Sequence, residues 1–310
     1  MSIDYSDLLK KLKKQEKTES LSDFRLFNLC TFKIGGKADL VVSPETESDF
    51  ITTLGMLSES NIPYLVVGSA SNLLFSDDGF NGAIVRTHRL NALTVHGNIL
   101  TAEAGVPLSK LSQAAMRCGS GGFHGLCGIP GRVGGSLVTA SGAFGCNIYD
   151  HIRSCRIYLP KENRIEELPL QPDDFSYRTC PTILKNATLL SASFNLIPNP
   201  EPQESIQAKI TACSEKRKAT QPQGVPSAGS YFKRPENAPP AAYLIDQAGL
   251  KGARVGGAQV SEKHAGFIIN VGNATAKDVQ ALADQIKTEI IKTYGVELKE
   301  EVIFIPKTGR

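Results

Sequence analysis

The stretch 226-PSAGSYFKRPEN-237 places a hydroxyl, Ser230, after small residues and directly before two aromatic rings, with Lys233 and Arg234 next in line. Two interpretations are open. The segment can be a turn and nothing more, since glycine, proline and serine are the usual residues of turns. It can also hold a serine in a dry pocket beside positive charge, where the hydroxyl could hand over a proton. This loop alone does not decide between the two.

Two glycine-rich stretches, 68–72 and 128–135, could bind a phosphate-bearing ligand. Glycine lets the backbone approach a ligand closely, and successive N–H groups in such turns form anion cradles. The common nucleotide motifs are absent, because no G-x-x-x-x-G-K-[ST] occurs and 128-GIPGRVGG-135 is not G-x-G-x-x-G. Each stretch can equally be a structural turn, so the spacing supports only a phosphate-bearing ligand gripped by backbone.

Composition narrows the class of protein. The 310 residues exceed the ~250–300 at which single cores tend to split, so we expect two or three lobes. A net charge of +3 is too small to indicate nucleic acid or a membrane surface. No apolar run approaches ~18 residues and the N-terminus lacks the apolar core of a signal peptide, so a cytoplasmic protein is expected. Seven cysteines without a C-x-x-C pair predict reduced thiols, and neither a metal site nor a disulfide framework.

Hydrophobic periodicity predicts the elements that must position these loops. We expect helices over 46–59, 108–118, 205–218 and 241–248, and a last helix from a cap at Asn273 or Thr275 to Gly295. We expect strands over 64–68, 83–85, 152–159, 188–196, 266–270 and 300–305, and a hairpin over 93–104. Residues 1–20 are expected to be helical and solvated. The polar, proline-rich segment 198-PNPEPQE-204 predicts a domain boundary.

The order of several motifs resembles one family. The run 65-LVVGSASNLLFSDDGFNGAIVR-86 resembles the diphosphate-gripping segment of a large group of FAD-binding domains. It is followed by 128-GIPGRVGGSLVTASGAFG-145, 175-FSYR-178, 227-SAGSYFKRP-235, 249-GLKGARVGGAQVSEKHAGFIIN-270 and a C-terminal L-x-x-E-V. Together, over residues 22–305, these resemble the UDP-N-acetylenolpyruvoylglucosamine reductases, flavoenzymes of peptidoglycan synthesis. The chain is similar to their shorter, type II form, because no extra loop separates Arg178 from the linker.

The resemblance implies an α+β fold, in which a two-lobed FAD-binding domain of the PCMH type is followed by a smaller α+β substrate-binding domain. The implied parts are a polar N-terminal extension (1–20), a first FAD-binding lobe (21–86, with the C-terminal strand 302–310), a second lobe (87–200) and a substrate-binding domain (204–301).

The resemblance also implies two half-reactions in one pocket. NADPH would pass a hydride to N5 of noncovalently bound FAD, and the reduced flavin would pass it to the vinyl carbon of UDP-N-acetylglucosamine enolpyruvate. Negative charge would spread onto the carboxylate as an enolate, which Arg178 and Glu301 would stabilise. Glu301 would be protonated or act through water, because two facing anions repel each other. Ser230 would protonate the enolate carbon, which answers the question that its loop raises.

Further positions match the family's binding residues. The implied flavin contacts are Gly68, Ser69, Ala70, Ser71, Asn72, Leu73, Gly128, Ile129, Pro130, Gly131, Gly134, Gly135, Ser141 and Gly142. The implied substrate contacts are Tyr177, Lys233, Arg234 and Gln259, although Tyr177 can equally be a core residue. Lys263 and His264 lie in a matching run and are expected to be structural. No metal is implied, and a monomer is expected.

Some positions depart from the family pattern. Its Gly-Gly-Gly-Ser-Asn is here 68-GSASN-72, so two positions gain a Cβ, which we expect to loosen flavin binding slightly. Its Asn-Thr-Phe is 30-CTF-32, its Met-Asn-Ala-Gly is 139-TASG-142, and its Asp-Ser after Tyr-Arg is Thr179-Cys180.

Three other functions stay open. The first is an FAD-dependent oxidase of a small hydroxylated substrate on the same scaffold, which would need none of Ser230, Arg178 and Glu301. The second is a non-catalytic nucleotide-sugar-binding protein, which the bulkier flavin loop would suit. The third, a basic nucleic-acid binder, has little support at +3 with no tryptophan. Flavin content together with NADPH turnover separates the first two from a reductase.

Overall fold

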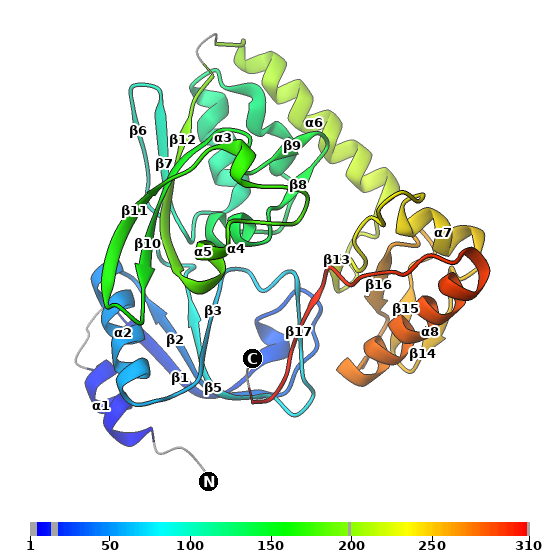
Figure 1. Cartoon of the computed structure of the whole chain (residues 1–310), viewed down its shortest axis with the longest axis horizontal. Helices are drawn as coiled ribbons and strands as arrows, with labels where there is room; N and C mark the ends of the chain where they lie inside the picture. Colours follow the sequence, from blue (N-terminus) through cyan, green and yellow to red (C-terminus); the bar gives the residue numbers. More distant parts are fainter. Residues whose placement is uncertain (1–4, 14–17, 198–199, 309–310) are drawn as a thin grey trace. The chain divides into compact units, whose positions relative to one another are not determined.

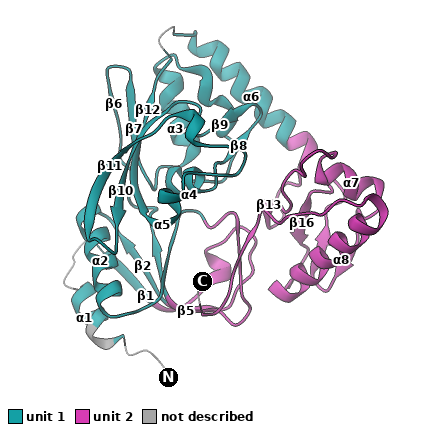
Figure 2. Ribbon diagram, in the orientation of Figure 1, with its two compact units in different colours: residues 1–21, 40–69, 83–217 teal, residues 22–39, 70–82, 218–310 magenta. Residues whose placement is uncertain are grey.

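The computed structural model of the chain describes residues 5–13, 18–197 and 200–308. It contains two compact units, and each is described by itself. Unit 1 comprises residues 1–21, 40–69 and 83–217, and unit 2 comprises residues 22–39, 70–82 and 218–310 (Figure 2). Each unit is therefore assembled from separate stretches of sequence. The glycine-rich loop 68–72 passes from one unit to the other between Ser69 and Ala70.

A four-stranded sheet carries the first glycine-rich loop. Its order is β1 (Thr18–Arg25), β2 (Lys37–Pro44), β5 (Phe80–Arg86) and β3 (Tyr64–Val67). Strands β3 and β5 are parallel, with Val67 opposite Arg86. Helix α2 (Glu47–Glu59) connects β2 to β3 and begins where expected, because the Thr46 hydroxyl accepts a hydrogen bond from the Asp49 N–H at 3.1 Å. The loop 68–72 thus leaves the carboxyl end of β3.

The second sheet of unit 1 is antiparallel and has five strands. Its order is β11 (Arg164–Pro169), β10 (Ile152–Leu159), β12 (Thr188–Asn195), β7 (Ile99–Glu103) and β6 (Leu93–His96). Helices α3 (Leu108–Arg117) and α4 (Val133–Val138) lie on one face of it, with η2 (Gly121–Leu126) between them in the chain (Figure 1). The short strands β8 (Gly142–Ala143) and β9 (Cys146–Asn147), η3 (Pro172–Asp174) and α5 (Thr182–Asn186) complete this part. Leu100, Leu111, Phe123, Leu137 and Phe194 belong to its core.

The N-terminal helix differs from the expectation of a solvated segment. Helix α1 (Ser6–Lys13) buries Leu8 and Leu12, which join Phe50 and Leu54 of α2 in one core cluster. The reason is their spacing, because two leucines four residues apart share one face of a helix. Residues 18–20 also differ from the expectation of a helix, since they lie in β1. The rest of the predicted extension, 1–4 and 14–17, lies outside the described residues.

Helix α6 (Gln203–Thr220) attaches mainly to unit 1. The Glu201 N–H donates to Gly119 O at 2.9 Å, Ile206 and Ile210 are buried, and the Arg217 guanidinium lies 5.2 Å from the centre of the Phe144 ring. The compact units divide after Arg217, within this helix, whereas the predicted boundary is the linker 198–204. The predicted domain bounds stay predictions, because a division by contacts does not test them.

Unit 2 holds a smaller antiparallel sheet. Its order is β13 (Ser227–Ser230), β16 (Phe267–Asn270), β15 (Ala258–Val260) and β14 (Arg254–Val255). Helix α8 (Ala276–Tyr294) packs on β14 and β15 and contacts α7 (Ala241–Gln247) (Figure 1). The unit also contains η1 (Leu26–Asn28) and a parallel pair, β4 (Leu73–Phe75) with β17 (Ile303–Ile305). Within the described residues, no helix is both long and apolar enough to cross a membrane.

Candidate functional site

Ser230 lies beside a β-bulge in unit 2. In the pairing of β13 with β16, Ser227 opposes Ile269 and Ser230 opposes Phe267, with a shift of register between them. Gly229 has a φ of +82°, which glycine adopts without the strain of a side chain. A bulge turns the following side chain away from the regular alternation. Ser230 is exposed, while Tyr231 and Phe232 after it are buried.

Glu301 reaches the same part of unit 2 through backbone hydrogen bonds. Its N–H donates to Tyr231 O at 2.8 Å, and its carbonyl oxygen accepts from Asn72 Nδ2 at 3.0 Å. The neighbouring Glu300 forms an ion pair with Lys287 of α8 at 2.8 Å. Unit 2 therefore brings together the predicted proton donor's strand, the predicted glutamate and one residue of the glycine-rich loop.

Thr31 is a site residue that the sequence analysis missed as a contact. Its hydroxyl donates to Ser227 O at 2.7 Å and lies 3.5 Å from Ser71 O. It thereby links the strand of Ser230 to the glycine-rich loop. The sequence signal for this contact is the motif 30-CTF-32. Thr31 matches the family's Asn-Thr-Phe, and only Cys30 departs from it.

The predicted substrate residues of unit 2 differ in their burial and in their hydrogen bonds. Lys233 is half-buried and its N–H donates to Lys299 O at 2.8 Å, whereas Arg234 is exposed. On β15, Gln259 Nε2 donates to Gly252 O at 3.2 Å, which braces the β14–β15 hairpin. Gln259 thus lies on a braced hairpin, and its contact with substrate stays a prediction.

Lys263 and His264 have structural contacts, as expected. Lys263 Nζ donates to Lys218 O, and His264 Nδ1 accepts from the Gly266 N–H at 3.1 Å. Burial lowers the pKa of His264, which favours the neutral ring that can accept this hydrogen bond.

Arg178 occupies a strained turn in unit 1. Ser176 and Thr179 exchange two backbone hydrogen bonds of 3.0 Å, and between them Arg178 has a φ of +53°. Its Nη1 donates at 3.2 Å to the carbonyl oxygen of Ala140, which has a φ of +45° itself. Left-handed backbone costs a residue with a side chain about 1 kcal/mol, and it persists where the surroundings hold it.

Tyr177 accompanies Arg178 at the surface. The centre of its ring is 5.1 Å from the Arg178 guanidinium carbon, and the side chain is 51% exposed. A core role for Tyr177, the alternative left open by the sequence, is therefore wrong. The ring therefore contacts the guanidinium and leaves about half of its surface exposed.

The two glycine-rich stretches leave backbone accessible in the way a dinucleotide requires. In unit 1, Gly135 is exposed, and a Cβ placed on it would meet no atom within 4 Å. A Cβ on Gly68 would lie 3.3 Å from Arg132 Cβ, so this position has little room for a side chain. The Ser141 and Thr139 hydroxyls are 2.8 Å apart. These features fit the FAD contacts that the sequence predicts.

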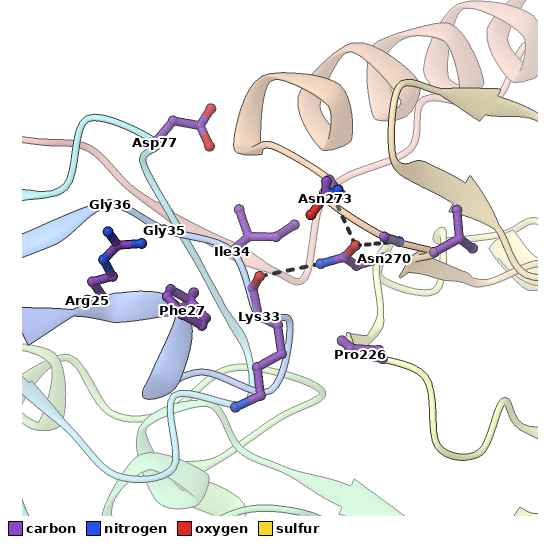
Figure 3. A pocket seen from close by; sticks show the side chains of 13 residues that line it. Arg25, Phe27, Lys33, Ile34, Gly35, Gly36, Asp77, Pro226, Asn270 and Asn273 are labelled. Carbon is purple, nitrogen blue, oxygen red and sulfur yellow. Dashed lines mark hydrogen bonds between the residues drawn. The ribbon is translucent and has the colours of Figure 1, made fainter.

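A cavity of about 720 Å³ lies elsewhere in unit 2, and none of the predicted site residues lines it (Figure 3). Asn270 Nδ2 donates to Phe32 O at 3.2 Å, and its Oδ1 accepts from the Gly272 N–H at 3.0 Å. Asp77 accepts from the Ala276 N–H at 2.7 Å at the start of α8. Because these polar side chains bind backbone groups, they connect segments of unit 2 at the wall of the cavity and have a structural role.

The structure offers no metal centre among the residues it describes, since no group of three or more His, Cys, Asp or Glu side chains could hold an ion. All seven cysteines are free thiols. Burial raises the pKa of Cys180, so this thiol, which lies next to the Arg178 turn, is protonated and unreactive at neutral pH.

Comparison with known proteins identifies the class and then the family. Residues 38–166 match the family model of an FAD-binding domain, and residues 221–305 match that of the UDP-N-acetylenolpyruvoylglucosamine reductase C-terminal domain. The chain is thus an FAD-binding oxidoreductase of mixed α+β fold, as predicted.

The relatives cover its whole length. It is 38% identical over 299 residues to the UDP-N-acetylenolpyruvoylglucosamine reductase of Clostridium beijerinckii, 96% of each chain. It is 40% identical over 287 residues to that of Caldicellulosiruptor bescii, covering 93% of this chain and 91% of that one. The crystal structure of the enzyme from Thermus caldophilus matches with a TM-score of 0.75 and 29% identity, over 93% of this chain and 98% of that one. The chain belongs to the UDP-N-acetylenolpyruvoylglucosamine reductase family.

Proposed function

We propose that the chain reduces UDP-N-acetylglucosamine enolpyruvate to UDP-N-acetylmuramate with NADPH, by way of Arg178, Ser230 and Glu301. Family membership makes it a UDP-N-acetylmuramate dehydrogenase of peptidoglycan synthesis. The observation that carries this is 38% identity over 96% of both chains. No observation favours the oxidase or the non-catalytic binder over it.

Bound FAD would supply the redox chemistry, the transfer of a hydride from NADPH to the vinyl carbon of the substrate. The loops 68–72 and 128–142 are the part of the chain that would hold it, through backbone N–H groups and the Ser141 hydroxyl. Their exposed backbone at Gly135 and their lack of room for a Cβ at Gly68 support this assignment.

Arg178 would stabilise the charge that develops on the substrate. As the vinyl carbon is reduced, negative charge spreads from the neighbouring carbon onto the carboxylate. A guanidinium fork binds a carboxylate through two parallel hydrogen bonds. The Ala140 carbonyl and the Tyr177 ring already hold Arg178 in place, so little reorientation is needed when the charge appears.

Ser230 would donate the proton to the enolate carbon. A serine hydroxyl is a weak acid in water, and Ser230 is exposed in the structure. The bound substrate must therefore exclude water from it, and Lys233 and Arg234 must contribute positive potential. Glu301, held beside the strand of Ser230 by its N–H, would act as a protonated acid or through water, since its anion would face the substrate carboxylate.

Single-turnover spectra of the bound flavin test these roles, with NADPH added first and the enolpyruvyl nucleotide second. We expect purified protein to be yellow. We expect Ser230→Ala to leave flavin reduction by NADPH unchanged and to slow flavin reoxidation by the substrate ~10²–10⁴-fold, the usual loss when a general acid is removed. Ser230→Cys should be slowed less, because a thiol still donates. Ser227→Ala, in the same strand, is the control and should retain both phases.

Two outcomes would contradict the proposal. If Ser230→Ala slows both phases equally, Ser230 serves folding or binding rather than proton transfer. A colourless protein that takes up no FAD would remove the flavin mechanism altogether. The proposal also includes a monomer of the type II form in the cytoplasm; the free thiols support a reducing compartment, and sedimentation tests the monomer.

A further inference from the structure

A cluster of basic side chains in unit 1 has no part in the mechanism above. It consists of Arg86, His88 and Arg132, with Arg89 at its edge. Arg86 is the last residue of β5 and lies opposite Val67, after which the glycine-rich loop begins. Arg132 belongs to the second glycine-rich stretch, 128–135. The cluster therefore joins the two segments that the sequence assigns to a phosphate-bearing ligand.

Several donors of this cluster are buried without a partner. Arg132 Nη1 donates to Gly105 O at 2.5 Å. Its Nε, the Nε of Arg86 and the Nδ1 of His88 are buried, and no described residue forms a hydrogen bond with them. Most buried polar atoms of folded proteins have a partner, because an unmade hydrogen bond leaves the cost of desolvation unopposed. Three such atoms in one cluster indicate that a ligand acceptor completes it.

The cluster also has too little negative charge. Glu19 is the one carboxylate among the described residues that influences it, and this group pairs with Arg89 at 3.0 Å. Burial, followed by the charge of Arg86, lowers the pKa of Arg132. Burial and the neighbouring guanidinium groups lower the pKa of His88 to about 4, so its ring is neutral at pH 7. Two partly desolvated guanidinium groups thus remain near each other, and the one acid that acts on Arg86 is already paired with Arg89.

The cluster lies directly against the first glycine-rich loop. A Cβ on Gly68 would be 3.3 Å from Arg132 Cβ and 3.6 Å from Arg132 Cδ, so the side chain of Arg132 runs along the backbone of Gly68. An anion held by the N–H groups of this loop would be within reach of the same guanidinium. The charge of Arg132 and the backbone N–H groups of this loop can therefore act on the same anion.

We infer that Arg86, His88 and Arg132 form a phosphate-binding site, which takes the diphosphate of the bound flavin adenine dinucleotide. This inference rests on the proposed function for the identity of the ligand. The chemistry itself requires only a phosphate group, which a free nucleotide or inorganic pyrophosphate also presents. Charge-assisted hydrogen bonds from a guanidinium to phosphate oxygens would satisfy both the unpartnered Nε atoms and the excess charge.

Flavin titrations of the full-length protein test the inference without using activity. In Arg132→Gln we expect FAD to bind about 10- to 100-fold more weakly, the range for loss of a hydrogen bond to a charged group. Riboflavin, which has the same ring and no phosphate, should bind within a factor of about two of wild type. Arg164→Gln makes the same change of charge on β11, where Arg164 pairs with Glu166 at 2.7 Å, and should leave both affinities unchanged. Arg132→Lys, which keeps the charge without the fork, should lie between.

Thermal unfolding of the flavin-free protein separates binding from a structural role. Arg132 leaves its buried Nε without a partner and gives one hydrogen bond to Gly105 O, so its removal should change the midpoint of the flavin-free form little and should reduce the rise that FAD produces. A lower midpoint together with equal losses for FAD and riboflavin would overturn the inference, as would unchanged FAD binding. If Arg132→Gln does not fold, Arg86→Gln gives the same readings.

The inference can fail separately from the proposed function. If the wild-type protein takes up no FAD, the proposed cofactor is wrong. The response of the protein to inorganic pyrophosphate then tests the phosphate site by itself. A midpoint raised by pyrophosphate in wild type but not in Arg132→Gln supports a phosphate site without flavin. Equal responses of the two proteins to pyrophosphate refute the site.

Discussion

Strained single residues mark the candidate site in both units. Ala70, Ala140 and Arg178 have φ values of +48°, +45° and +53°, in the left-handed region that favours glycine. Each lies in a segment that the sequence assigns to flavin or substrate. Such residues stay in this conformation only where the surrounding structure holds them. Asn61 and Asn163 have positive φ values outside these segments, so the conformation alone does not define the site.

Ala70 shows how one departure from the family pattern acts. The sequence predicts that Ser69 and Ala70 both loosen the flavin loop by adding a Cβ, yet only Ala70 has a positive φ. We therefore predict that Ala70→Gly stabilises the flavin-free protein by about 0.5–1 kcal/mol, the relief of left-handed strain less the added freedom of the unfolded chain.

Urea unfolding of the full-length protein measures this change. Ser71→Gly is the matched control, because Ser71 is the adjacent residue and lies outside the left-handed region, so glycine there should lower the free energy of unfolding by about 0.4–1 kcal/mol. Losses of similar size in both variants would show that Ala70 is not strained.

At the scale of elements, the start of α8 shows how side chains fix one helix to a neighbouring turn. Thr275 Oγ1 accepts from the Asp278 N–H at 3.0 Å, and Asp278 Oδ2 accepts from the Thr275 N–H at 2.9 Å, which is a capping box. The same Asp278 oxygen lies 3.3 Å from the Gly257 N–H in the β14–β15 turn. The hydrogen bond from Thr275 is the main cause that lowers the pKa of Asp278.

This cap makes part of the stability depend on pH. Because the pKa of Asp278 is lower in the folded state, its contribution is complete above the unfolded pKa of ~3.9 and is lost as the pH falls through the folded value. We predict that Asp278→Asn lowers the free energy of unfolding by about 1 kcal/mol at pH 7, the usual worth of a cap, and by less near pH 3.

Urea unfolding at the two pH values is the measurement for Asp278. Asp284→Asn removes a carboxyl from the same helix that forms only a surface ion pair with Lys287, and it should change stability by less than ~0.5 kcal/mol. A difference between Asp278→Asn and wild type that stays constant with pH would argue against the cap as its source.

The elements with strong local signals were predictable. Helices α2, α3 and α8 begin and end close to their expected positions, and Gly295 ends α8 with a φ of +67°. Strands β1 and β11 were missed because they lie at the edges of their sheets and are mostly polar, so their pairing depends on partners distant in sequence.

The residues of the candidate site were predictable from the sequence, but the contacts between them were not. The motifs indicate Ser230 and Glu301, but only the fold places the Glu301 N–H on Tyr231 O, since these two residues are 70 positions apart in the sequence. The cluster of Arg86 and Arg132 depends on the register of β5 with β3, which no local pattern encodes. The convergence of Arg178 with Ser230 and Glu301 on one flavin stays a prediction.

At the scale of the whole molecule, unit 2 depends on two short segments that are distant from most of it in sequence. Several contacts join 22–39 and 70–82 to the C-terminal part, and three of them show how. Strand β4 pairs with β17, Asn270 Nδ2 donates to Phe32 O at 3.2 Å, and Asp77 accepts from the Ala276 N–H at 2.7 Å. The first and third contacts satisfy backbone groups of β17 and α8, and the second satisfies the side-chain amide of Asn270, all of which residues 218–310 alone would leave open.

We therefore predict that a fragment of residues 203–310, although it contains the whole predicted substrate-binding domain, does not fold stably alone. It lacks the strand that pairs with β17 and the carboxylate at the start of α8, and it exposes Ile305, which is buried in the chain and pairs with Phe75 of the missing strand. Circular dichroism and amide dispersion by NMR measure this directly.

Co-expression with residues 1–202 is the control, because it restores both short segments and should recover a cooperative transition and FAD uptake. A fragment that unfolds cooperatively alone, at a midpoint near that of the full chain, would show that the sheet of β13–β16 with α7 and α8 is sufficient, and that the contacts from 22–39 and 70–82 only attach it.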